Sequence, residues 1–165
     1  MISKLALGGA NFGLDYGFTN SFGKISTSEL SKILLEAKSA GIEVIDTAQA
    51  YGDSEVQIGT YNNSRFNIVT KIGVELGRDF RDDCISRLIS DSCKSLKQAS
   101  LYAVMLHRPE VLLSEYGSKI VYELEALKSK QIISKIGVSI YSPDILSDIS
   151  KLIDIDIVQA PFNIF

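Results

Sequence analysis

The chain has 165 residues, of which 45% are apolar, enough to bury the core of one domain over residues 1–165. Its net charge is −3 and its 17 basic residues are scattered, which argues against nucleic acid or a membrane surface as a partner. No apolar run reaches transmembrane length, and the first residues lack the pattern of a secretory signal.

The two cysteines, Cys84 and Cys93, lie nine positions apart in a helical pattern and therefore project from different sides of the helix. This spacing predicts free thiols, with neither a disulfide nor a shared metal ion. A cytoplasmic protein without a metal site is the expectation that follows.

Strand-like and helix-like patterns alternate along the whole chain. A capping box from Ser26 to Glu29 predicts the start of the first long helix, and Gly41 its end. Ser142 followed by Pro143 predicts another helix start. Apolar spacing places further helices near 55–59, 85–96 and 120–127, and strands at 4–7, 42–45, 66–71, 101–106, 136–139 and 155–159.

Strands separated by helices pair in parallel through right-handed crossovers, so the fold class is α/β. A doubly wound sheet is one option, but Gly8, Gly9 and Gly13 lack the spacing of a dinucleotide-binding turn and are better explained as turn glycines. A (β/α)8 barrel of the TIM type is favoured, because polar residues end five successive strands and would share the carboxyl rim where barrel enzymes keep their sites. These residues are Asp46, Lys71, His107, Ser139 and Gln159.

A carboxylate, a lysine, a tyrosine and a histidine on one rim suggest a particular chemistry. A free tyrosine has a pKa near 10, and an ammonium group beside it favours the phenolate. Tyr51 near Lys71 is therefore a candidate general acid, with Asp46 holding the ammonium in place. His107 would donate a second hydrogen bond to the same carbonyl oxygen. No side chain here is an evident nucleophile, so a hydride from a cofactor fits the set.

Five ordered motifs resemble the aldo-keto reductase family, and the resemblance runs from Lys4 to the last residue. The motifs are Asp46-Thr47-Ala48-x-x-Tyr51-Gly52, Thr70-Lys71, Leu106-His107-x-Pro109, Ile136-Gly137-Val138-Ser139 and Gln159-x-Pro161-Phe162-Asn163. The resemblance implies an eight-stranded barrel that uses NADPH or NADH to reduce small aldehydes or ketones.

By match to the family, Tyr51 is the proton donor, Asp46 and Lys71 tune it, and His107 orients the substrate. Ser139 and Gln159 match positions that hold the nicotinamide carboxamide. Two positions depart from the family pattern: Ile140 stands where asparagine often follows the serine, and Phe162 stands where tyrosine is frequent.

A barrel of this kind needs about 250 residues or more, so we expect about six of the eight strands here, an N-terminal part of the barrel. By resemblance, the remaining part carries the aromatic that stacks on the nicotinamide and the basic loop that binds the adenosine phosphates. Weak cofactor binding and an inactive 165-residue chain are thus one expectation.

One alternative is a non-catalytic binding protein whose open sheet edge pairs with another chain, with Ile155 and Ile157 poorly covered. Another is self-association through the exposed edges that completes a barrel-like assembly and restores cofactor binding.

Each candidate residue also has a purely structural interpretation. Asp46 and His107 are also typical of turns at strand ends, Lys71 of a solvated rim, and Tyr51 of a packed loop. Nearby, residues 53–55 are most simply explained as caps of the short helix.

Overall fold

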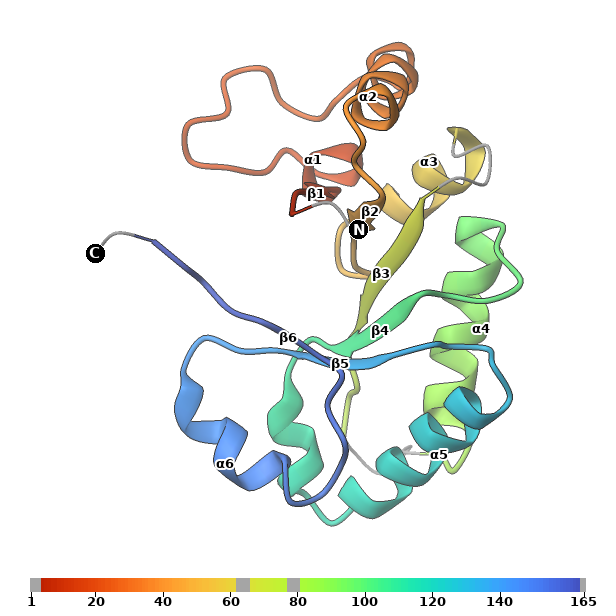
Figure 1. Cartoon of the computed structure of the whole chain (residues 1–165), viewed down its shortest axis with the longest axis vertical. Helices are drawn as coiled ribbons and strands as arrows, with labels where there is room; N and C mark the ends of the chain where they lie inside the picture. The colour runs from red at the N-terminus through yellow and green to blue at the C-terminus, as the bar shows by residue number, and fades with distance from the viewer. Residues whose placement is uncertain (1–3, 62–65, 77–80, 164–165) are drawn as a thin grey trace.

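The computed structural model describes residues 4–61, 66–76 and 81–163, and its core is a sheet of six parallel strands. Each strand pairs with the next one along the chain, which is the order of a barrel and not of a doubly wound sheet. The sheet curls (Figure 1), so the prediction of an α/β fold of the TIM-barrel type with six strands is confirmed. The strands are β1 (Ala6–Gly8), β2 (Val44–Asp46), β3 (Asn67–Ile72), β4 (Ala103–Leu106), β5 (Ile136–Ser139) and β6 (Ile157–Gln159).

Helices α2 to α6 lie around the outside of the curled sheet (Figure 1). The helices are α1 (Ala10–Gly13), α2 (Thr27–Ser39), α3 (Ser54–Tyr61), α4 (Cys84–Leu96), α5 (Gly117–Ser129) and α6 (Leu146–Ile149), with 3-10 turns η1 (Pro109–Leu113) and η2 (Pro143–Ile145). Within the described ranges, none of these helices combines the length and the apolar character needed to cross a membrane.

The predicted helix boundaries rest on local hydrogen bonds. The Ser26 side chain accepts from the Glu29 amide while the Glu29 carboxylate accepts from the Ser26 amide, which confirms the capping box. Gly41 ends the α2 region with φ of +78°, a value that favours glycine. The helix expected after Ser142 begins as η2 and continues only through the short α6.

Side chains along the strands alternate between two apolar clusters. The outer cluster fills the space between the sheet and the helices, and it includes Ile45, Ile68 and Val104. A small inner cluster lies on the concave face, around Val69 and Met105. In β3 this alternation places Lys71 on the same side as Val69, and therefore on the concave side of the sheet.

β1 and β6 are the outermost strands, each with one neighbour in the described sheet. The exposed apolar residue of β6 is Val158, at 46%. Ile155 and Ile157 are half-buried, and they pack against the outer and inner clusters respectively. The expectation that these two isoleucines are poorly covered is therefore only partly met.

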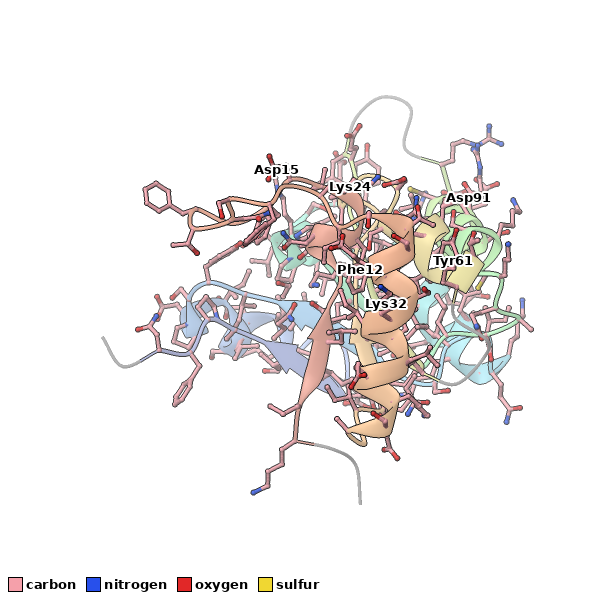
Figure 2. The ribbon with its side chains drawn as sticks, turned by 90° about the horizontal axis from the view of Figure 1, so that it is seen from above. Phe12, Asp15, Lys24, Lys32, Tyr61 and Asp91 are labelled. Atoms are coloured by element: carbon pink, nitrogen blue, oxygen red, sulfur yellow. The ribbon has the colours of Figure 1, made fainter. Side chains whose placement is uncertain are left out.

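A long segment from Asp15 to Lys24 connects α1 with α2 and extends away from the sheet (Figures 1 and 2). Its large side chains Phe18 and Phe22 are fully exposed. The segment returns to the fold at Lys24, whose ammonium pairs with Asp53 at 2.5 Å, just before α3.

Candidate active site

The carboxyl ends of five strands bring the predicted polar residues to one rim. Asp46, Ser139 and Gln159 are the last residues of their strands, Lys71 is the last but one of β3, and His107 follows β4 directly. Strand alternation turns all five inward, because each stands two residues after an inner-face position. The predicted convergence on one rim is therefore present.

Lys71 and Asp46 form the centre of this rim. The Lys71 ammonium lies 2.6 and 2.8 Å from the two Asp46 carboxylate oxygens and 3.3 Å from the Thr47 carbonyl oxygen. Only 2% of the Lys71 side chain is exposed, against 21% for Asp46. Lys71 is thus a buried cation held by a carboxylate, and its interpretation as a solvated rim residue is excluded.

Tyr51 sits on the loop that joins β2 to α3. Its amide donates to the Ala48 carbonyl at 3.0 Å, and its carbonyl accepts from the Ser54 amide at 3.1 Å, so the loop is a series of tight turns. Gly52 has φ of +59°. The loop packs so closely on Gly13 that a Cβ there would collide with the Tyr51 carbonyl oxygen and the Ser54 amide. Gly13 is required for close approach, which refines its interpretation as a turn glycine.

This loop places the Tyr51 hydroxyl beside the buried ion pair. The Lys71 ammonium donates to the Tyr51 hydroxyl oxygen at 3.4 Å and lies 5.0 Å from the centre of its ring. The rings of Tyr51 and His107 meet edge to face, with centroids 6.1 Å apart and planes at 89°. Asp46, Tyr51, Lys71 and His107 therefore form one contiguous cluster, as the sequence predicted.

The environment of His107 favours its neutral form. Partial burial lowers its pKa from the ordinary value, the charges of Lys71 and Arg108 lower it further, and Asp46 acts in the opposite direction. A neutral imidazole has one N–H to donate. The backbone amide of His107 donates to the Ile72 carbonyl at 2.9 Å, which fixes the start of the segment after β4.

Ser139 and Gln159 are paired across β5 and β6 in the sheet register. Gln159 also reaches back to β2, where its side-chain amide donates to Asp46 at 3.2 Å. The sequence predicted only a cofactor contact for Gln159, so its hydrogen bond to Asp46 of the ion pair is a further role that the structure shows. Ser139 lines a cleft of about 630 Å³ beside His107, together with Glu75, Arg108, Glu110 and Tyr141.

The polar contacts behind the loop, some exposed and some buried, were not predicted. Of the residues expected to cap α3, Asp53 pairs with Lys24 and Gln57, and Ser54 donates to the Gly9 carbonyl at 2.8 Å. Glu55 accepts from the Thr70 hydroxyl at 2.6 Å. A strand that is buried on both faces shows no polar and apolar alternation, so nothing in the sequence marked Thr70 as the partner.

The two cysteines of the sequence lie in α4, away from the strand ends. Cys84 and Cys93 are both free, as predicted, and burial raises the pKa of each thiol. Over the three described ranges, no group of three histidine, cysteine, aspartate or glutamate side chains gathers as a metal site would require.

The cluster has the parts of a site that protonates an oxygen. A hydroxyl donor and an imidazole N–H can meet at one carbonyl oxygen, and a buried ammonium beside the hydroxyl stabilises the negative charge left when its proton departs. None of the cluster side chains is arranged as an activated nucleophile. Such a site is suited to a carbonyl compound whose carbon receives its electrons from another molecule.

Comparison with known proteins finds matches over most of the chain. The sequence model of the Aldo/keto reductase family matches residues 4–165. Among curated proteins, D-arabinose 1-dehydrogenase of Saccharomyces cerevisiae is 30% identical over 156 residues, which cover 88% of this chain and 45% of the yeast protein.

Two solved structures show the same fold. A candidate aldo-keto reductase from Pseudomonas aeruginosa superimposes with a TM-score of 0.81 at 26% identity, over 99% of this chain and 64% of its own. An aldo-keto reductase of Klebsiella pneumoniae, solved with NADPH, gives a TM-score of 0.69 at 21% identity, over 93% of this chain and 51% of its own. The chain thus spans about half to two thirds of the length of these proteins.

Proposed function

The chain belongs to the aldo/keto reductase family, and from this premise we propose that it takes part in the reduction of an aldehyde or ketone by a nicotinamide cofactor. The observation that carries the proposal is the contact of the buried Lys71 ammonium with both Asp46 and the Tyr51 hydroxyl. If these residues served only in turns or on the surface, the burial of the Lys71 ammonium at the rim would have no explanation.

Each residue of the cluster has its own task in the proposed reaction. The Tyr51 hydroxyl and the His107 imidazole donate hydrogen bonds to the carbonyl oxygen and orient the substrate. Tyr51 then gives its proton to that oxygen while the carbonyl carbon is reduced. Lys71 stabilises the charge that develops on the Tyr51 oxygen, and Asp46 keeps the ammonium in place.

The residues at the ends of β5 and β6 fit a nicotinamide carboxamide. That group presents both an amide donor and a carbonyl acceptor, and the Ser139 hydroxyl and the Gln159 amide offer the complementary atoms. Gln159 keeps one N–H and its carbonyl oxygen after donating to Asp46. We propose that these two residues bind NADPH or NADH, which supplies the hydride when bound.

The cleft beside His107 suggests the class of substrate. Glu75 and Glu110 offer acceptors there and Arg108 offers donors. A purely apolar carbonyl compound would strip water from these groups without replacing their hydrogen bonds. We propose a small carbonyl compound that bears hydroxyl groups, in keeping with the name of the yeast relative.

A second candidate function is self-association through the sheet edges. It is favoured by the outer position of β6 and the exposure of Val158 in that strand. Sedimentation over a range of concentrations distinguishes this candidate, because a monomer at all concentrations would contradict it. Partner binding and a cytoplasmic location stay predictions, as does the extent of the single domain.

The test of the reductase proposal is the dependence of carbonyl reduction on Tyr51. Loss of turnover on replacing Tyr51 with Phe is the expected result. Unchanged turnover in that variant would remove Tyr51 from its proposed role.

A further inference from the structure

Glu55, in the first turn of α3, is a carboxylate buried on the outer side of the sheet. Only 7% of the residue is exposed. In the part of the chain that the structure describes, no lysine or arginine forms an ion pair with it. Burial raises the pKa of Glu55, while hydrogen bonds from Thr70 and Ser92 lower it. A buried carboxylate is costly without partners, so these hydroxyl groups are needed to hold it.

Two donor paths of this polar network end at the Glu55 carboxylate. The Gln49 side-chain amide donates its two protons to the Leu88 carbonyl at 2.8 Å and to the Ser92 hydroxyl oxygen at 2.9 Å. Ser92 has a single proton, which is thereby directed to Glu55. Thr70 donates from the other side at 2.6 Å. Glu55 is the shared acceptor at which both donor paths end.

This network anchors both ends of the loop that carries Tyr51. Gln49 and Glu55 lie on either side of Tyr51 in the sequence, and both are anchored to β3. The Gln49 amide donates to the Lys71 carbonyl at 3.0 Å, and Glu55 binds the side chain of Thr70, the residue before Lys71. Thr70 faces outward and Lys71 inward, so the same short stretch of β3 holds the loop and supplies the ammonium.

We propose that Glu55 is a positioning residue for Tyr51. By accepting from Thr70 and Ser92, it fixes the loop between β2 and α3 at the distance at which the Tyr51 hydroxyl meets the Lys71 ammonium. The effect on turnover rests on the proposed reductase function, whereas the effect on the loop does not.

Amide hydrogen exchange of the loop tests the placement without any cofactor. The reporters are the amides of Gln49 and Tyr51, which are bonded to the Lys71 and Ala48 carbonyls. Thr70→Val keeps the shape of the side chain and removes its donor, so these amides should exchange at least tenfold faster. Thr70→Ser keeps the hydroxyl and should restore slow exchange.

Ile58→Val is the matched control. Ile58 is fully buried on the same helix as Glu55 but lies outside the network, so this variant loosens packing without removing a donor. Its loop amides should exchange as in the parent chain. Ser92→Ala removes the second donor and serves as the test variant should Thr70→Val fail to fold. Equal loop exchange in a folded donor variant and in Ile58→Val would overturn the proposal.

Steady-state kinetics give the second measurement. Thr70→Val should lower kcat for carbonyl reduction about tenfold and leave the KM for the carbonyl compound nearly unchanged, with recovery in Thr70→Ser. A rise in KM alone would contradict a role in placing the proton donor. Absence of turnover in the parent chain would count against the reductase function, and the exchange result would still decide the role of Glu55.

Discussion

The Lys71 ammonium lies 2.6 Å from one carboxylate oxygen of Asp46 and 2.8 Å from the other. Lys71 is almost completely buried, so Asp46 supplies the charge that offsets its desolvation. The pair joins β2 to β3 at the rim and sets the position of the cation that Tyr51 meets. The roles proposed for Tyr51 and Lys71 therefore depend on this ion pair.

Removal of the carboxylate should therefore be costly. We expect Asp46→Asn to lower the free energy of unfolding by about 3 kcal/mol, because it leaves a buried ammonium without its counter-ion. The matched control is Asp53→Asn, which removes the exposed pair with Lys24 and should cost less than about 1 kcal/mol. Urea denaturation followed by circular dichroism measures both, and equal values would contradict the buried pair.

The titration of His107 reports the charges around it. His107 is the single histidine of the sequence, so its ring protons are identified in an NMR spectrum without further assignment. We expect its pKa below the ordinary value of about 6.5. Lys71→Met should raise the pKa and Asp46→Asn should lower it, because Lys71 and Asp46 act on His107 with opposite signs. Shifts of the same sign in the two variants would contradict the arrangement.

The same shift makes stability depend on pH. The pKa of His107 is lower in the folded chain than in the unfolded chain, so the unfolded chain binds the proton first as the pH falls. Stability should therefore decrease as the pH falls below about 6.5, until the folded form is protonated too. His107→Gln should lack this component when unfolding is measured at several pH values.

Gly13 should tolerate no side chain, because a Cβ there would strike the loop at Tyr51 and Ser54. We expect Gly13→Ala to destabilise the chain by about 1–3 kcal/mol, the usual cost of overpacking. Gly8→Ala is the matched control, since a Cβ at Gly8 meets nothing within 4 Å. Thermal unfolding of the two variants gives the comparison, and a neutral Gly13→Ala would show that the loop is not packed as described.

The sequence predicted most of what fixes the position of the site. Apolar runs and helical spacings, which alternate along the chain, predicted the strands and helices. The carboxyl ends of parallel strands share one edge, so Asp46, Lys71 and His107 could be placed on one rim from the sequence. The capping box at Ser26 is local in sequence and was equally predictable. These features depend on neighbours within a few positions or on the order of the strands.

What could not be predicted depends on contacts between distant segments. The bond from Gln159 to Asp46 joins β6 to β2 and requires the curl of the sheet to be known. The hydrogen bond from the Thr70 hydroxyl to Glu55 could not be predicted either, because the sequence does not show that Thr70 faces the helices. In a strand buried on both faces the residue pattern does not distinguish the two sides.

Carbonyl reduction by the chain, with and without the Tyr51 hydroxyl, tests the central claim most directly. The assay follows the absorbance of NADPH or NADH at millimolar concentration in the presence of a small hydroxylated aldehyde. The control is Tyr122→Phe, which removes the hydroxyl of a tyrosine that is 74% exposed. We expect equal turnover in the parent chain and the control, and a loss of about a hundredfold or more in Tyr51→Phe. Equal turnover in Tyr51→Phe and the parent chain, or no reduction by the parent chain, would contradict the proposed function.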